Sequence, residues 1–225
     1  MNFYISNPEL DNTINEIKRK FKLSMNGITA DYMKNSGIIY KLNFGVSIPR
    51  IKEIAQGYKP NSDLADRLWV IGIRETMIMS TLIQPIEGFK IEKAMSRIDG
   101  TDKMELVEQL SMNLLAKLPY ATTLCTQCIN SPRLWTQITG FMLLLRIYQQ
   151  FSKSELIQLI DKTFELTDTD EFHLYKAIGL SLSRCCRKDA SVAAYILEKI
   201  KMKADKDSDA LRYIANELKQ ETEFL

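Results

Sequence analysis

One carboxylate stands out in the stretch TDKMELVEQL, residues 101–110, because it lies apart from the apolar residues around it. Glu108 falls one turn beyond Met104, with Ser111 nearby, and off the stripe that helical spacing predicts for the core: Leu106, Val107, Leu110, Leu114 and Leu118. A carboxylate held in a cleft can stabilise positive charge that develops during a reaction, whereas a solvated glutamate does no chemistry. The spacing alone leaves both interpretations of Glu108 open.

Four cysteines and one histidine are the other residues that could do chemistry. Cys125 and Cys128 form a C-x-x-C pair within an expected helix, but a zinc site needs a second chelating pair. The adjacent Cys185 and Cys186 make a poor one, so we predict reduced, buried thiols and no metal. His173 stands alone and is expected at the surface or near a helix cap. The sequence lacks a glycine-rich phosphate loop and a Ser/His/Asp set, so no cofactor is predicted.

A basic stripe is predicted on the helix expected over residues 170–187. Leu174, Ile178 and Leu182 mark its core side, and the opposite side carries Lys176, Leu180, Arg184 and Arg187. Cations at this spacing can meet successive DNA phosphates, and a contact surface also explains why a leucine lies among them. A solvated face is the alternative, which explains only the charges. Lys103 and Arg50, the second at a helix start, are further candidates for DNA binding.

Helices must position these residues, because helical periodicity recurs along almost the whole chain and no convincing strand pattern is present. The helix over 133–149 is apolar nearly all round, so it is expected in the centre of the fold, with Trp135 and Met142 as core residues. Plausible N-caps are Ser47, Thr101, Ser131, Ser152, Asp168 and Asp189. The expected helices lie near residues 8–23, 25–35, 48–57, 61–70, 73–82, 88–98, 102–117, 119–129, 133–149, 153–166, 170–187, 189–202 and 206–221.

From about residue 61 onward the expected helices come in pairs with a period of about 35–40 residues, which is typical of HEAT-like or armadillo-like repeats. Since no helix pair can bury its apolar face alone, the pairs should stack. The predicted fold is therefore all-α, a curved α-α superhelix (solenoid), with an irregular α bundle as the alternative. We expect a single domain over 1–225, comprising an N-terminal helix within 1–30, an entry segment over 31–58 and stacked helix pairs over 59–225.

The composition agrees with a helical protein, since only 9 of the 225 residues are Gly and 6 are Pro. The net charge of +2 does not indicate a nucleic-acid binder, but DNA binding needs a local basic stripe rather than a basic total. No apolar run approaches the roughly 18 residues of a membrane span, and the first residues do not resemble a secretory signal. We predict a soluble, cytoplasmic protein with no membrane partner, which would reach the nucleoid in a bacterium.

Four segments follow one another in an order and spacing typical of a known family. They are DYMKNSGIIYKLNFGVSIPRIKEIA (31–55), LADRLWVIGIRETMIMSTLI (64–83), SPRLWTQITGFMLLLRIY (131–148) and FHLYKAIGLSLSRCCRK (172–188). Over roughly residues 31–190 the chain resembles the DNA alkylation repair family, the HEAT-like alkylpurine DNA glycosylases. The resemblance implies a basic concave face that holds duplex DNA. It also implies a cleft in which aromatic rings, a carboxylate and an arginine promote release of an alkylated, cationic base.

The resemblance also implies which residues occupy that cleft. The family's two aromatic positions fall on Met104 and Leu180, its arginine falls on Ile138, and its aspartate falls on Glu108. Met and Leu have no ring to hold a cationic base, and Ile138 cannot contact a phosphate. Glu108 is one methylene longer than aspartate, and a misplacement of about 1 Å can cost about a hundredfold in rate. The carried-over site is therefore degenerate, and whether the protein is an enzyme stays open.

Three hypotheses follow, in this order of preference. The first is a HEAT-like DNA-binding protein of this family that recognises duplex, damaged or branched DNA by shape, through phosphates, with glycosylase chemistry lost or weak. The second is an active alkylpurine DNA glycosylase, a hydrolase of N-glycosidic bonds, that uses Glu108 to stabilise the oxocarbenium-like sugar. The third is a helical-repeat scaffold for a protein partner, which the near-neutral net charge favours.

Overall fold

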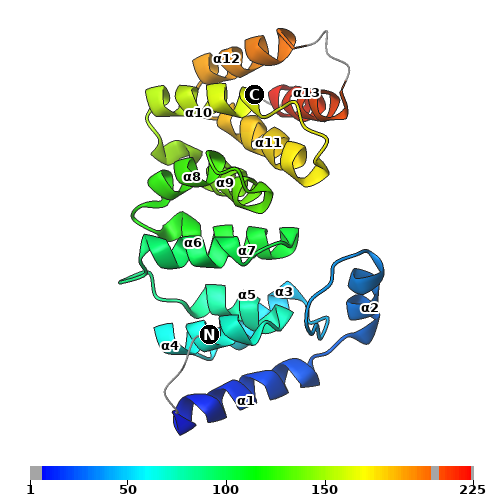
Figure 1. Cartoon of the computed structure of the whole chain (residues 1–225), viewed down its shortest axis with the longest axis vertical. Helices are drawn as coiled ribbons and strands as arrows, with labels where there is room; N and C mark the ends of the chain where they lie inside the picture. The colour runs from blue at the N-terminus through cyan, green and yellow to red at the C-terminus, as the bar shows by residue number, and fades with distance from the viewer. Residues whose placement is uncertain (1–6, 204–207, 224–225) are drawn as a thin grey trace. The chain divides into compact units, whose positions relative to one another are not determined.

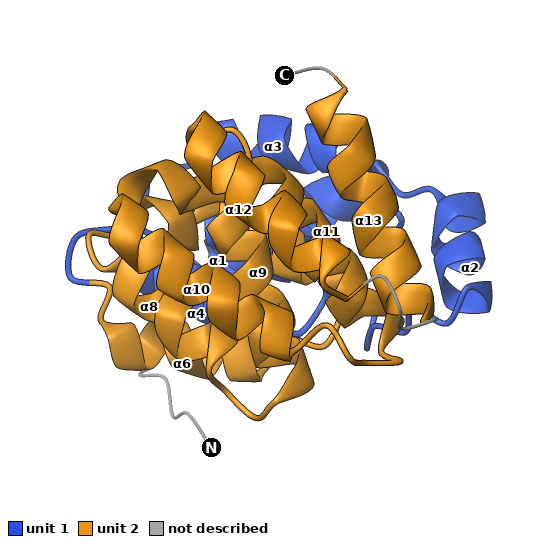
Figure 2. Ribbon diagram, turned by 90° about the horizontal axis from the view of Figure 1, so that it is seen from above, with its two compact units in different colours: residues 1–88 blue, residues 89–225 orange. Residues whose placement is uncertain are grey.

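The computed structural model describes residues 7–203 and 208–223, whose helices are labelled in Figure 1. Within these residues the chain forms thirteen α-helices and two short 3₁₀-helices, and the β pairing is limited to an isolated bridge between Leu42 and Ile73. A helix is present at each expected place, so the all-α prediction is confirmed. The chain divides into two compact units, unit 1 (residues 1–88) and unit 2 (residues 89–225), shown in Figure 2. No helix in the described ranges has the length and apolar character that crossing a membrane requires.

The described residues of unit 1, 7–88, form five helices, of which α4 and α5 make the most extensive contact. α5 also packs against α3, and α1 packs against α3 and α4. The helices are α1 (Pro8–Leu23), α2 (Gly27–Asn35), α3 (Ile48–Gln56), α4 (Ser62–Ile71) and α5 (Arg74–Ile83). The first four begin at side chains whose oxygen accepts a backbone N–H of the first turn, namely Asn7, Asn26, Ser47 and Asn61.

A buried ion pair holds the loop between α2 and α3. The Arg74 guanidinium donates to Glu75 Oε1 at 2.9 Å and to the Val46 carbonyl at 2.8 Å, and both charged side chains are almost fully buried. The Glu75 carboxylate accepts hydrogen bonds from the backbone N–H groups of Phe44 and Val46, each at 3.2 Å. Because each of these buried polar groups has a partner, the pair fixes the path of residues 44–46.

Unit 2 is organised around α9, which packs against α6, α7, α8 and α11, as its nearly all-apolar sequence predicts. Ile138 and Phe141 are completely buried there, and Met142 is almost so. Gly140 permits the close crossing with α8, because a Cβ at this position would lie 2.8 Å from the backbone nitrogen of Ile129. The helices are α6 (Ile91–Asp99), α7 (Met104–Asn113), α8 (Ala121–Ile129), α9 (Leu134–Ile147), α10 (Lys153–Glu165), α11 (Phe172–Cys185), α12 (Ala190–Lys201) and α13 (Asp209–Thr222), with 3₁₀-helices at Leu115–Lys117 and Tyr148–Gln150.

Half of the predicted N-caps are confirmed, namely Ser47, Ser152 and Asp189, and Ser152 forms a full capping box with Glu155. The predictions at Thr101, Ser131 and Asp168 are wrong, because α7, α9 and α11 begin one or two residues later than expected, after Lys103, Arg133 and Glu171. The Thr101 hydroxyl donates instead to the Arg97 carbonyl at 2.8 Å, at the end of α6. α7 therefore starts at Met104 without a side-chain cap.

All four cysteines are buried, as predicted. The Cys125 thiol donates to the Gly140 carbonyl at 3.3 Å in the α8–α9 contact. Burial raises the pKa of Cys128 and of Cys186 to about 12. Since a thiolate is the reactive form, these side chains act as packing residues at neutral pH.

Candidate functional site

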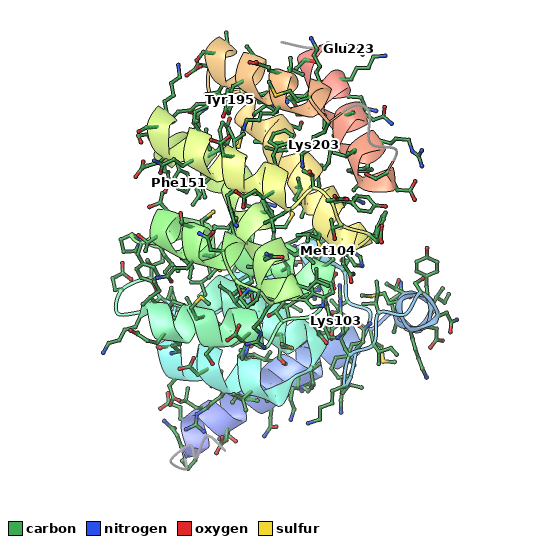
Figure 3. The ribbon with its side chains drawn as sticks, turned by 45° about the horizontal axis from the view of Figure 1, so that its top comes forward. Lys103, Met104, Phe151, Tyr195, Lys203 and Glu223 are labelled. Carbon is green, nitrogen blue, oxygen red and sulfur yellow. The ribbon has the colours of Figure 1, made fainter. Side chains whose placement is uncertain are left out.

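α7 presents Glu108 away from the core of unit 2. The predicted core stripe is confirmed, because its members are all buried: Leu106, Val107, Leu110, Leu114 and Leu118. Glu108 is half-buried and so lies at the edge of the packed face, neither in the core nor fully in water. Met104 is also half-buried, and Figure 3 places it with Lys103 at the start of α7, on the side of unit 2 away from Phe151 and Tyr195.

Two cations from neighbouring helices lie close enough to Glu108 to affect its carboxyl group. Burial raises the pKa of the Glu108 carboxyl, and the positive charges of Arg146 and Lys176 oppose that rise. Arg146 belongs to α9 and Lys176 to α11, and α9 packs against both α7 and α11. We call Glu108, Arg146 and Lys176 the Glu108 cluster. None of the three forms a salt bridge with another described residue.

The raised pKa of Glu108 leads to a prediction for the substitution Glu108→Gln. An acid whose pKa is higher in the folded protein favours folding less once it ionises, so wild type should lose stability relative to E108Q as the pH rises above its ordinary pKa of 4.5. Thermal unfolding of both proteins at about pH 4.5 and about pH 7.5 measures this. The Tm difference should grow with pH in favour of E108Q. If the Tm of wild type instead rises relative to that of E108Q as the pH increases, the positive charges of Arg146 and Lys176 have a larger effect on the pKa of Glu108 than burial has.

The three other positions that the resemblance assigns to a cleft differ in their exposure. Ile138, which the resemblance places at the family's arginine, is 0% exposed in α9 and belongs to the core, so it cannot reach a ligand. Met104 and Leu180 are half-buried and offer apolar, non-aromatic surface. Arg146 is a cation close to Glu108 that sequence reasoning did not find. The signal was present, because Arg146 is the single charged residue of the α9 sequence LWTQITGFMLLLRI.

α11 carries the predicted basic stripe, with its core side confirmed at Leu174, Ile178 and Leu182. Lys176 is half-buried, and its Nζ lies 5.7 Å from the centre of the Phe172 ring. Arg184 is also half-buried and forms no salt bridge with any described residue. Lys176 and Arg184 are thus members of the stripe that no salt bridge with a described residue holds.

Arg187, the last member of the stripe, is bound within unit 2. Its guanidinium forms an ion pair with Glu221 of α13, and Ser183 donates to the same carboxylate at 3.1 Å. The pKa of Glu221 is lowered, first by Arg187, then by Ser183 and by the nearby charge of Arg184. α13 packs closely along α11, since a Cβ on Gly179 would lie 3.1 Å from the Tyr213 ring. Arg187 thus anchors α13.

The two remaining candidates, Lys103 and Arg50, each form an ion pair with a nearby carboxylate. Lys103 is the residue before α7 and forms an ion pair with Asp102. Arg50 belongs to unit 1, where its guanidinium contacts Glu53 at 2.7 Å and donates to the Ser24 hydroxyl at 3.1 Å.

An aromatic cluster at the start of α11 was not found by sequence reasoning. Trp135, expected in the core, is half-buried, and its ring centre lies 5.4 Å from that of the exposed His173. The chain of ring contacts continues from His173 to Phe172 at 5.4 Å, to Tyr175 at 5.5 Å and to Tyr213 of α13 at 5.7 Å. The signal was the run FHLY, which gathers three rings in one helical turn. His173 is at the surface, as predicted.

Comparisons with known proteins agree with this architecture. A solved structure described as "a new family of proteins related to the HEAT-like repeat DNA glycosylases with affinity for branched DNA structures" is similar over 92% of this chain and 94% of that chain, with a TM-score of 0.76 and 18% sequence identity. This likeness confirms the predicted HEAT-like fold. Comparison with curated proteins found no match. The family model described as "DNA alkylation repair enzyme" matches residues 17–214, and because this range covers most of the sequence, the chain belongs to the DNA alkylation repair enzyme family.

Proposed function

We propose that this protein binds DNA through phosphate contacts on the face where α7, α9 and α11 present the Glu108 cluster, and that it recognises DNA shape or damage rather than sequence. One observation carries the proposal. Arg146, Lys176 and Arg184 stand on neighbouring helices, and none forms a salt bridge with another described residue. Cations that no salt bridge holds can bind phosphates without first breaking an ion pair, and each adds salt-dependent affinity.

The solved relative supports the choice of DNA shape as the recognised feature. That protein is described as having affinity for branched DNA. In this chain the cations Arg146, Lys176 and Arg184 suit the phosphate backbone, whose contacts carry no base sequence. Branched, bent or damaged DNA differs from plain duplex in the path of its phosphates and in deformability, so a rigid set of cations can distinguish them.

Glycosylase chemistry is proposed to be lost or weak. The position of the arginine holds the fully buried Ile138, and the aromatic positions hold Met104 and Leu180. A departing cationic base would therefore meet no aromatic ring at these positions and no arginine at Ile138. Arg146 supplies a cation in the same cluster, but a positive charge beside Glu108 opposes, rather than assists, stabilisation of a positively charged sugar.

One observation favours the second candidate function, an active alkylpurine DNA glycosylase. Burial raises the pKa of Glu108, so its carboxylate is partly desolvated. A desolvated carboxylate stabilises nearby positive charge more strongly than a solvated one. Alkylated bases also leave readily, so a single carboxylate could suffice for slow release. In that case E108Q should abolish base release while DNA binding persists.

The test combines binding and base release with the wild-type protein. Fluorescence anisotropy with plain duplex, abasic-site duplex and a four-way junction, each at low and high salt, should show binding that weakens steeply with salt. Incubation with alkylated DNA should release little or no base. Release that E108Q abolishes would establish the glycosylase instead. Absence of binding to all three DNAs at low salt would overturn the proposal in favour of a protein-binding scaffold.

A further inference from the structure

Exposed apolar side chains gather on one short segment of unit 1. On α2, Ile28 is 85% exposed and Tyr32, one turn later, is 73% exposed. Large exposed apolar residues also flank α2 on both sides, namely Leu23, Met25, Ile39 and Leu42. Single exposed apolar residues are ordinary, but a group within 20 residues indicates an interaction site.

α2 itself stands apart from the other helices of its unit, as both Figure 1 and Figure 2 show. It shares no extensive contact with any described helix. Its main inward residue is Met33, whose sulfur accepts a hydrogen bond from the Asn43 side chain at 3.3 Å. The apolar side chains of α2 are therefore not the edge of a packed core, and burial within unit 1 does not explain them.

The N-terminal end of α2 is nevertheless held in place by backbone contacts. The Asn26 backbone N–H donates to the Phe44 carbonyl at 2.8 Å. Gly45 has φ of +68°, and a Cβ there would lie 2.1 Å from the Asn26 carbonyl oxygen, so the loop and the start of α2 are in direct contact. The same loop is held from the other side by Arg74 and Glu75. A buried ion pair thus fixes the loop that carries α2, which is the arrangement expected of a helix that must be presented in one position.

The sequence that contains and flanks α2 is strongly basic. Between Lys18 and Lys52 the chain carries eight Lys or Arg residues and one carboxylate, Asp31, although the whole protein has a net charge of only +2. Six of these cations form no salt bridge with any described residue: Lys18, Arg19, Lys22, Lys34, Lys41 and Lys52. The surroundings of the exposed apolar side chains therefore favour a polyanion and disfavour a second copy of the same basic segment.

We infer that Ile28 and Tyr32 form an apolar wedge that stacks on bases left unstacked at a DNA branch point, while the surrounding lysines and arginines contact the phosphates. This inference rests on the proposed function. It specifies that unit 1 recognises the unstacked bases at the branch point. Apolar side chains that insert at unstacked base steps are a common means of binding distorted DNA, and rings stack on exposed bases without reading sequence. α2 has only nine residues and exposes Asp31, Lys34 and Asn35, so it is too short and polar for a membrane surface.

The test compares a four-way junction with a linear duplex of the same arm sequence, using Ile28→Ala combined with Tyr32→Ala. Both side chains are exposed, so the variant should keep the unfolding temperature of wild type. We expect junction affinity to fall about tenfold or more and duplex affinity to change less than about twofold, with the salt dependence of both unchanged. Met202→Ala is the matched control, because Met202 is a large, exposed apolar residue of unit 2.

A 2-aminopurine base placed at the branch point provides a direct readout of stacking. Wild type should quench its fluorescence, and the double variant should not. Equal losses on junction and duplex, or none on either, would overturn the wedge while leaving the proposed DNA-binding function standing. Wild type that binds neither DNA would overturn the proposed function and the wedge together. Wild type that binds anionic phosphatidylglycerol vesicles through Ile28 and Tyr32, with DNA binding unchanged, would assign α2 to a membrane surface.

Discussion

Simultaneous replacement of Lys176 and Arg184 by glutamate should weaken DNA binding by about a hundredfold at low salt, for duplex and junction alike. The expected loss is large because two phosphate contacts disappear and two negative charges replace them. The slope of log affinity against log salt concentration should become less steep by about two, one unit for each lost contact. Fluorescence anisotropy over a salt series measures both quantities.

A control with the same change in net charge separates local from global effects. Lys153 and Lys162 belong to α10, outside the face formed by α7, α9 and α11, and each lies within 4.0 Å of an acidic partner. Reversal of both charges should weaken binding far less than reversal of Lys176 and Arg184. Equal losses in the two variants would mean that only net charge matters. Unchanged affinity of the first variant would remove α11 from the interface.

Sequence reasoning located the helices well because their periodicity is a local property. The buried stripe of α7 and the core side of α11 follow directly from which residues recur every three or four positions. Helix starts were less predictable, because several side chains compete for the same backbone groups. Thr101 illustrates this: its hydroxyl bonds the end of α6 and so is not available for the start of α7.

The sequence predicted which residues of the candidate site face outward, but not which charged residues lie close to one another. The helical period placed Glu108 off the core and Lys176 and Arg184 on an outward face, which the structure agrees with. Arg146 and Glu108 are 38 positions apart in the sequence and come close only because α7 packs against α9. The spacing of residues within one helix does not predict such a contact. The same is true of Arg187, whose partner Glu221 lies 34 positions away.

Adjacent charged residues in an otherwise apolar helix are also ambiguous in sequence. Arg74 and Glu75 belong to a segment that resembles the family, yet their types alone suggest an exposed helix start. The structure buries both, because the loop over residues 44–46 supplies one carbonyl and two N–H groups that satisfy them. A buried charge is stable only with such partners, and those partners come from a distant part of the chain.

Replacement of Glu75 by alanine should lower the free energy of unfolding of unit 1 by about 3–5 kcal/mol. The Arg74 guanidinium would lose its carboxylate partner in a buried site, and two backbone N–H groups of the loop would lose their acceptor. The two tryptophans provide the measurement, since Trp69 lies in unit 1 and Trp135 in unit 2. In a Trp135→Phe background, urea unfolding followed by fluorescence reports unit 1 alone.

Glu53→Ala is the matched control for this loss. Glu53 also pairs with an arginine, Arg50 at 2.7 Å, but its side chain is 64% exposed, so its removal should change stability by less than about 0.5 kcal/mol. A loss below about 1 kcal/mol for E75A would mean that solvent reaches the pair and that the loop is not held by it. Loss of the ion pair should also affect the position of α2, because the N-terminal end of α2 contacts that loop at Phe44 and Gly45. Junction affinity should therefore fall in E75A, at a temperature where it remains folded, and stay unchanged in E53A.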